Sequence, residues 1–156
     1  GLAASAKQKG QKHRVFVMMG DGETCEGSVW EAAMAGRALH LGNLVGIVDR
    51  NRQLMTSFSE DSILLEPYAD KWRSFGWNVI EVEDGNDMKQ VVEALDSIPD
   101  SNSDIPTVII SNSIKGKGVS FMEKQIKWHC GSLTKDDLQV ALSDLEAAYE
   151  KQRKEL

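Results

Sequence analysis

RVFVMMGDGETCEGSVWEAAMAGRALHLGNLVGIVDRN, residues 14–51, contains two apolar runs on either side of a stretch with helical spacing. The runs predict a buried strand over about 14–19 and a second strand near 44–50, and the spacing between them predicts a helix over about 28–41. Asp21 falls on the turn between the first strand and the helix. A β-α-β unit of this kind predicts parallel strands.

The same alternation continues to the end of the chain. We expect a loop over 51–67, a short helix over 68–76, a strand over 77–83, a helix over 87–98 capped by Asn86 or Asp87, a strand over 107–113, and an amphipathic helix over about 134–153 that closes the chain behind a Thr134–Asp137 capping box. Strands separated by helices predict an α/β fold, a three-layer α/β/α domain with a mainly parallel sheet. We expect residues 1–156 to form this single domain, truncated at its amino terminus because GLAASAKQKG resembles a helix interior.

Composition argues against several classes of protein. The 18 basic and 24 acidic residues leave a formal charge of −6, and the basic residues are scattered, which disfavours nucleic acid as a partner. No apolar run approaches the roughly 20 residues of a membrane span, so no membrane partner is expected. Cys25 and Cys130 have no paired neighbour in the sequence, which fits a reducing compartment, and we predict a cytoplasmic protein.

The turn around Asp21 has the features of a phosphate site. Gly20 and Gly22 let the backbone approach a ligand closely, and the helix behind them offers free N–H groups and a positive dipole end. The carboxylate of Asp21 would repel a phosphate unless a divalent cation lay between them. Asn51 can add a side-chain oxygen and Gln53 a main-chain carbonyl, which suits magnesium. The simpler alternative is that Asp21 only caps the helix.

A family resemblance rests on these residues. GDG followed after 30 positions by Asn51 resembles the thiamine-diphosphate motif, and residues 20–51 are similar to the transketolase branch, especially to split enzymes whose cofactor domain is a separate N-terminal subunit. The later stretches DGND, SIKGKGVSFME and KWH also resemble that branch. The similarity covers nearly the whole chain.

The resemblance implies a set of site residues. Asp21, the Asn51 side chain and the Gln53 carbonyl would hold Mg²⁺ or Ca²⁺. Thiamine diphosphate would contact Gly20, Asp21, Gly22, Glu23, Asn51, Met55 and His129. His129 would also reach the substrate end of the cleft. With His129, Glu26 and Glu31 are the implied catalytic residues: they match two family glutamates at the subunit interface that link paired active sites and contribute to assembly and cofactor activation. Both could instead be first-turn charges favoured by the helix dipole, or part of a solvated face.

The resemblance also implies an activity. It is that of a transketolase of the pentose phosphate pathway, which transfers a two-carbon ketol unit between sugar phosphates. A pyrimidine-binding domain, either a separate subunit or part of a longer polypeptide, would complete the site, so we expect this chain to be inactive alone, and a homo-oligomer is expected. Two alternatives stay open: an enzyme like 1-deoxyxylulose-5-phosphate synthase, and a non-catalytic module that binds a diphosphate or a nucleotide.

Other residues receive simpler interpretations. The family often has glycine where this chain has Arg52 and Cys130, so the local backbone is expected to differ there. Lys115 and Lys117 lack phosphate-loop spacing and are at most substrate-side residues. Cys25 is interpreted as a bystander thiol. Core positions are predicted for Met18, Met19 and Trp30.

Overall fold

The computed structural model describes residues 1–155 and contains one four-stranded parallel sheet. The strands are β1 (Val15–Gly20), β2 (Leu44–Arg50), β3 (Asn78–Val82) and β4 (Thr107–Asn112). Their order across the sheet is β1-β2-β4-β3, and each neighbouring pair is parallel. The α/β prediction is therefore confirmed.

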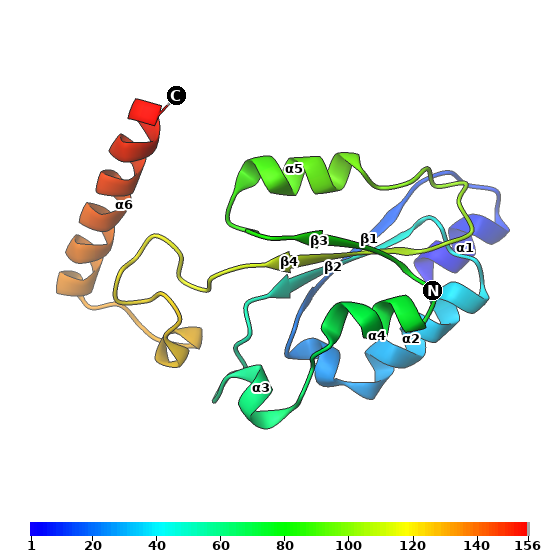
Figure 1. Cartoon of the computed structure of the whole chain (residues 1–156), viewed down its shortest axis with the longest axis horizontal. Coiled ribbons are helices and arrows are strands. Elements are labelled where there is room, and N and C mark those ends of the chain that lie inside the picture. The colour runs from blue at the N-terminus through cyan, green and yellow to red at the C-terminus, as the bar shows by residue number, and fades with distance from the viewer. Residues whose placement is uncertain (156) are drawn as a thin grey trace.

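Helices cover both faces of this sheet (Figure 1). They are α1 (Leu2–Gln8), α2 (Gly27–Ala38), α3 (Ser59–Ser62), α4 (Tyr68–Ser74), α5 (Met88–Asp96) and α6 (Lys135–Glu155), with 3₁₀ turns η1 (Glu23–Cys25) and η2 (Ile126–His129). Helices α2 and α4 lie against one face, and α5 lies against the other. The molecule thus has the three layers that the strand-helix alternation predicts.

The two faces bury different side chains. On the α2 and α4 face, Trp72 and Trp77 meet edge to face with ring centroids 5.1 Å apart, and the half-buried Trp30 packs beside them, as predicted for a core residue. On the α5 face the core is aliphatic, with Val45 of β2 and Ile109 of β4 against Ala94. Aromatic side chains bury more area each than aliphatic ones, so each core side chain on the α2 and α4 face contributes more buried area than one on the α5 face.

Strand β1 is less buried than the sequence predicts. It lies at the edge of the sheet, and in the part of the chain that the structure describes it pairs with β2 alone. Met19 is buried, but Phe16 is 51% and Met18 is 69% exposed. The core assignment of Met18 is therefore wrong. Helix α5 packs over β3, at the opposite edge of the sheet, and leaves this side of β1 uncovered.

The predicted helix caps are present. Asp87 caps α5, because its side chain accepts a hydrogen bond of 2.9 Å from the Lys89 N–H. Thr134 and Asp137 bond reciprocally at the start of α6, as a capping box does. Helix α6, predicted over 134–153, projects beside the sheet (Figure 1), and among the described residues no helix has the length and apolar character needed to cross a membrane.

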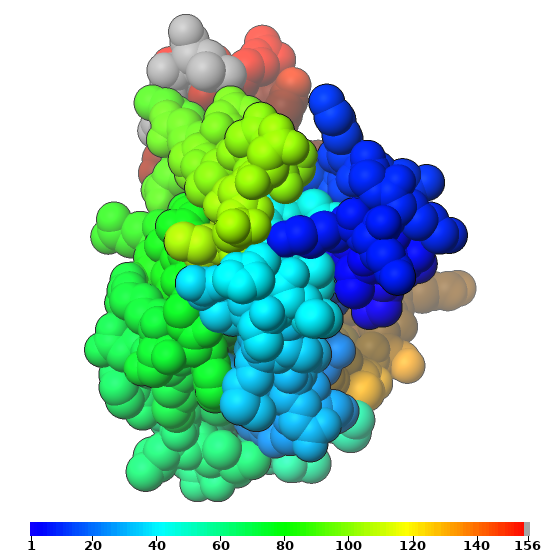
Figure 2. All heavy atoms as spheres, turned by 90° about the vertical axis from the view of Figure 1, so that its right-hand side faces the viewer, coloured from blue at the N-terminus to red at the C-terminus, as the bar shows by residue number. Residues whose placement is uncertain are grey.

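The amino ends of the strands form the end of the molecule seen in Figure 2. There the amino-terminal segment (dark blue) lies beside the turn before β2 (cyan) and the turn before β4 (yellow-green). Lys7 joins all three, since its Nζ donates to the His40 carbonyl at 2.5 Å and to Asp104 at 3.2 Å. The carboxyl ends of the strands, where ligands bind in folds of this kind, lie on the far side.

Candidate functional site

Parallel pairing brings the two predicted loops together. Gly20, the last residue of β1, is opposite Asp49 in β2, and the Asp21 N–H donates to the Asp49 carbonyl at 3.2 Å. Asp21 therefore leaves β1 at the level where β2 ends. Two loops separated by 30 positions in the sequence therefore meet at the carboxyl ends of β1 and β2.

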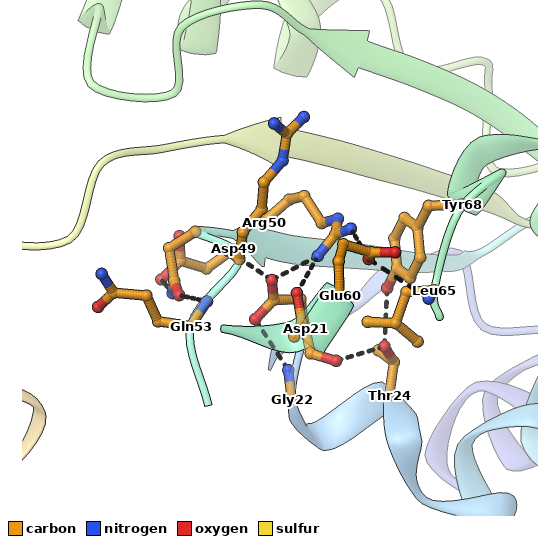
Figure 3. A network of polar contacts seen from close by, with 12 residues as sticks. Asp21, Gly22, Thr24, Asp49, Arg50, Gln53, Glu60, Leu65 and Tyr68 are labelled. Atoms are coloured by element: carbon orange, nitrogen blue, oxygen red, sulfur yellow. Dashed lines mark hydrogen bonds and ion pairs between the residues drawn. The ribbon is translucent and has the colours of Figure 1, made fainter. Parts of the chain in front are cut away.

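The carboxylate of Asp21 is buried and held from several sides (Figure 3). Its Oδ2 accepts from Arg50 Nη1 at 2.7 Å and from the Arg52 N–H at 2.6 Å. Its Oδ1 accepts from the Gly22 N–H at 2.9 Å. The side chain is 1% exposed, so its orientation is fixed by these groups rather than by water.

Arg50 was not singled out in the sequence, and it is the most connected residue of the site. It is 2% exposed and also binds Ser59 Oγ at 3.0 Å, Glu60 at 2.8 Å and Glu66 at 3.1 Å. Its guanidinium lies 4.9 Å from the centre of the Tyr68 ring. We call Arg50 and these partners, with Asp21, the Arg50 network. The sequence signal that could have identified Arg50 is a charged residue at the end of an apolar strand. A charge buried at such a position needs a partner.

The charges of this network stabilise one another. Burial by itself lowers the pKa of Arg50, but the hydrogen bonds to Asp21, Glu60 and Glu66 outweigh it and raise that pKa above its ordinary value. Burial would raise the pKa of Glu60, but its contacts, first with Arg50, lower it. The pKa of Glu66 is lowered chiefly by the Tyr68 N–H. The shifts thus favour the ionised forms of Arg50, Glu60 and Glu66.

A second chain of hydrogen bonds supports the turn backbone. Thr24 Oγ1 donates to the Asp21 carbonyl at 2.6 Å, and the Tyr68 hydroxyl donates to Thr24 Oγ1 at 3.0 Å (Figure 3). Burial raises the pKa of Tyr68, so its hydroxyl stays protonated and able to donate. Helix α4 and the turn after β1 are therefore tied together.

The end of β2 is held differently. Asn51 Oδ1 accepts from the Gln53 N–H at 2.9 Å, and Asn51 Nδ2 donates to Asp49 Oδ2 at 2.9 Å. The other Asp49 oxygen accepts from Ser113 Oγ, which ties the ends of β2 and β4. Gln53 is 4% exposed, and its Oε1 has no hydrogen-bond partner within the described chain. An unpaired buried oxygen is costly unless a ligand, an ion or water completes it.

One cleft of about 390 Å³ brings most of the predicted site residues together. It is lined by Gly20, Asp21, Gly22, Glu23, Glu26, Asp49, Asn51, Gln53, Leu54, Met55, Lys115 and His129. Every residue assigned to the metal or the cofactor from the sequence is in this set. Glu31 is not, since it lies exposed on α2 outside the cleft. Asp49 and Leu54 join the set without having been singled out in the sequence.

The residues of the cleft fit a hard divalent cation. Asp21 and Asn51 offer side-chain oxygens, and Gln53 offers its carbonyl and the unpaired Oε1. Within residues 1–155, Asp21 Oδ1 accepts a hydrogen bond from the Gly22 N–H alone, which leaves it able to bind an ion. Among residues 1–155 no group of three or more His, Cys, Asp or Glu side chains is placed to hold a metal, so a cation in this cleft would need the amide and main-chain oxygens as well.

The two positions where glycine was expected differ from each other. Arg52 has a φ of 62°, in the left-handed region that glycine adopts readily, and this conformation lets its N–H reach Asp21. Cys130 has a φ of −134°, which any residue adopts. Only the Arg52 position carries a conformation for which glycine would be suited.

Lys115, Lys117 and Cys25 lie at different positions relative to the cleft. Lys115 lines the cleft, whereas Lys117 lies 3.8 Å from Glu123 in an ion pair. Burial raises the pKa of the Cys25 thiol, and the Asp21 carboxylate raises it further. Cys25 is therefore a poor nucleophile at neutral pH.

Comparison with known proteins decides the family. Residues 2–152 match the family described as transketolase, thiamine diphosphate binding domain. This chain belongs to that family. It is 41% identical over 155 residues to an apulose-4-phosphate transketolase subunit of Phocaeicola vulgatus, covering 99% of this chain and 54% of that protein. It is 34% identical over 146 residues to the 6-deoxy-6-sulfo-D-fructose transketolase subunit SqwG of Clostridium sp., covering 94% and 52%.

The solved transketolases show the same fold. The crystal structure of the Campylobacter jejuni enzyme superposes with a TM-score of 0.81 at 23% identity, over 92% of this transketolase domain and 23% of that chain. A Pichia stipitis transketolase structure superposes with a TM-score of 0.68 at 22% identity, over 97% and 26%. The chain spans about half the length of the curated subunit relatives it matches.

Proposed function

We propose that this domain holds the diphosphate of thiamine diphosphate, together with Mg²⁺ or Ca²⁺, in a transketolase assembled from more than one chain or domain. The observation that carries the proposal is the cleft at the ends of β1 and β2. It collects oxygen ligands for a cation, glycine backbone for a phosphate and His129 at its rim. A capping role for Asp21 alone would not require Asn51, Gln53 and His129 to share one cleft with it.

Each residue has a distinct part in the proposal. Asp21 Oδ1, Asn51 Oδ1 and the Gln53 carbonyl hold the cation, which in turn neutralises the diphosphate. Gly22 lets that phosphate lie against the backbone. His129 is exposed and can rotate toward the ligand. The bound cofactor supplies the carbanion chemistry, while the protein binds and orients it.

The proposal includes a partner subunit. Two of the relatives are named as subunits of transketolases, which supports a split enzyme, and the other component would carry the pyrimidine-binding domain. We propose that Glu26 and Glu31 belong to an interface, because both are exposed and lie at and just after the start of α2. This chain would be inactive alone, would form a homo-oligomer within the assembly and would work in the cytoplasm.

The proposed reaction is two-carbon ketol transfer between sugar phosphates. The names of the two relatives specify a sugar with a phosphate and a sugar with a sulfo group, so we propose a substrate that carries an anionic group. A reaction like that of 1-deoxyxylulose-5-phosphate synthase is the competing enzyme activity. Release of CO₂ from pyruvate by the assembled enzyme would favour that synthase over a transketolase.

The first test is calorimetric titration of thiamine diphosphate into the chain, with Mg²⁺ and with chelator. We expect binding that requires the metal and that Asn51→Ala weakens at least tenfold, since one of the metal's oxygen ligands is removed. Asn51→Ala is preferred to Asp21→Ala as the test variant because it leaves the buried ion pair of Asp21 and Arg50 intact. Asp96→Asn, an exposed acidic residue on α5, is the matched control and should bind like the wild type.

Three outcomes contradict the proposal. Binding that is unaffected by chelator would remove the metal, and binding unaffected by Asn51→Ala would place the ligand elsewhere. If the wild type does not bind, the titration is repeated with the pyrimidine-domain subunit present. Failure in that mixture would leave a non-catalytic module as the better interpretation.

A further inference from the structure

Arg50 joins the turn that carries Asp21 to a segment that supplies no predicted ligand. This segment, residues 59–68, runs from α3 into α4 and holds Ser59, Glu60, Glu66 and Tyr68, all in contact with the Arg50 side chain. Figure 3 shows the guanidinium between Asp21 and Glu60. One buried side chain therefore connects the proposed metal ligand to the segment that covers it.

The two carboxylate oxygens of Asp21 differ in the number of hydrogen bonds that they accept. Oδ2 accepts from both Arg50 and the Arg52 N–H, so its capacity is used. Among the residues that the structure describes, Oδ1 accepts from the Gly22 N–H alone. A carboxylate oxygen can accept two bonds, so Oδ1 retains a free lone pair. Arg50 thus fixes the carboxylate so that one oxygen serves the protein and the other is left for an ion.

Charge makes this arrangement compatible with a cation. A lone buried guanidinium beside a metal ligand would repel a divalent ion. Here Arg50 is paired with three carboxylates, those of Asp21, Glu60 and Glu66. One positive and three negative charges leave this group of four side chains net negative, so the group as a whole does not repel a cation.

We propose that Arg50 is a positioning residue for the metal site: it orients Asp21 so that Oδ1 faces the ion, with Glu60 and Glu66 offsetting its own charge. The inference rests on the proposed function, since it takes Asp21 as a ligand. It adds Arg50 to the residues that shape the site and gives the 59–68 segment the role of holding Arg50. Neither point follows from the predicted ligand set. Arg50 touches neither substrate nor cofactor in this role.

The test measures how much Mg²⁺ is needed for half-maximal binding of thiamine diphosphate, by calorimetry at a fixed cofactor concentration. Arg50→Met keeps much of the length of the side chain and removes its charge. We expect it to raise the required Mg²⁺ concentration about 10- to 100-fold, the usual effect of losing a group that orients a metal ligand. Arg50→Lys should recover part of the loss, because a lysine can pair with Asp21 but cannot span both glutamates.

Two further variants separate positioning from stability. Trp77→Phe disturbs the core near the start of β3, where the Trp77 indole donates to the Ala33 carbonyl, and should lower the unfolding temperature without changing the Mg²⁺ requirement. Glu60→Gln with Glu66→Gln keeps Arg50 on Asp21 but removes two compensating charges. We expect this double variant to raise the Mg²⁺ requirement severalfold, and it can be read even if Arg50→Met does not fold.

The outcomes distinguish the two proposals. If the wild type binds with Mg²⁺ and neither the Arg50 variants nor the double glutamate variant shifts the Mg²⁺ requirement, the role of Arg50 is refuted while the cofactor site stands. A shift of the same size in Trp77→Phe would also refute it, since the effect would then follow from stability. If the wild type fails to bind with the partner subunit present, the proposed function fails and this inference fails with it.

Discussion

The two sides of Asp21 differ in whether ion pairs close them. On the side of the 59–68 segment, Arg50 binds three carboxylates and a hydroxyl, and the Tyr68 hydroxyl reaches Thr24. On the cleft side, Gln53 Oε1 is buried without a partner among the described residues, and Met55 and His129 are exposed. One side is closed by ion pairs, with Arg50 Nε left buried without a partner among the described residues, and the other side is open to a ligand.

This difference teaches which substitutions should affect stability and which should affect binding. Removing a member of a buried network of ion pairs leaves its partners unpaired, which costs folding free energy. Removing an exposed side chain from an open cleft leaves the fold nearly unchanged. Four changes test that division, from the largest expected loss of stability to the smallest.

Asp21→Ala should have the largest effect, because it leaves the Arg50 guanidinium buried without its closest carboxylate. We expect the free energy of unfolding to fall by about 3–5 kcal/mol, the cost of breaking a buried ion pair. Urea unfolding followed by tryptophan fluorescence measures it, with Asp96→Ala on the surface of α5 as control. A loss no larger than that of the control would mean that the Arg50 network contributes little to the fold.

Tyr68→Phe removes one hydrogen bond, that to Thr24, from the same side. We expect a loss of about 1 kcal/mol, the net contribution of a typical hydrogen bond. Tyr149→Phe removes the same hydroxyl from an exposed ring and should change nothing. Equal effects in the two variants would show that the Thr24 contact is not part of a stabilising network.

Acid should weaken the same side through Glu60 and Glu66. Their pKa values are lowered in the folded state from an ordinary value of 4.5, so the unfolded chain binds more protons and stability falls as the pH drops below about 4.5. Because both side chains are partly exposed, the contribution should be under about 1 kcal/mol. The double variant Glu60→Gln with Glu66→Gln should show a shallower decline in urea unfolding across this range. An identical decline would assign the acid sensitivity to other carboxylates.

His129→Gln should have the smallest effect on folding, within about 0.5 kcal/mol, because the side chain is exposed at the rim of the cleft. Its effect on binding should be larger, a roughly tenfold weaker affinity for thiamine diphosphate with Mg²⁺, as expected for one lost hydrogen bond to a charged group. His13→Gln, exposed outside the cleft, is the control. A change in stability without a change in affinity would place His129 with the scaffold.

Much of the fold follows from local patterns. The apolar runs over about 14–19 and 44–50 and the helical spacing between them are local features, and the structure contains the corresponding elements. The Asp87 cap and the Thr134–Asp137 capping box depend on neighbours three or fewer positions apart, and both are present. Interactions of this range are encoded by spacing alone.

Burial on β1 was not predictable in the same way. Met18 and Met19 are adjacent, apolar and alike in the sequence, yet one is exposed and the other buried. Which face of a strand is covered depends on where the next helices pack, and the strand order places β1 far from α5. The alternation of side chains along a strand shows that Met18 and Met19 face opposite sides of the sheet. It does not show which side is covered by a helix.

The sequence by itself determined which donor groups are present: a carboxylate between two glycines and an asparagine 30 positions later, oxygen donors of the kind that suit a divalent cation. Only the tertiary structure decided which side of Asp21 is closed. Arg50 and Glu66 are 16 positions apart, and their contact depends on the 59–68 segment folding back over the end of β2. A buried charge must find its partners in space, and spacing along the chain does not specify them.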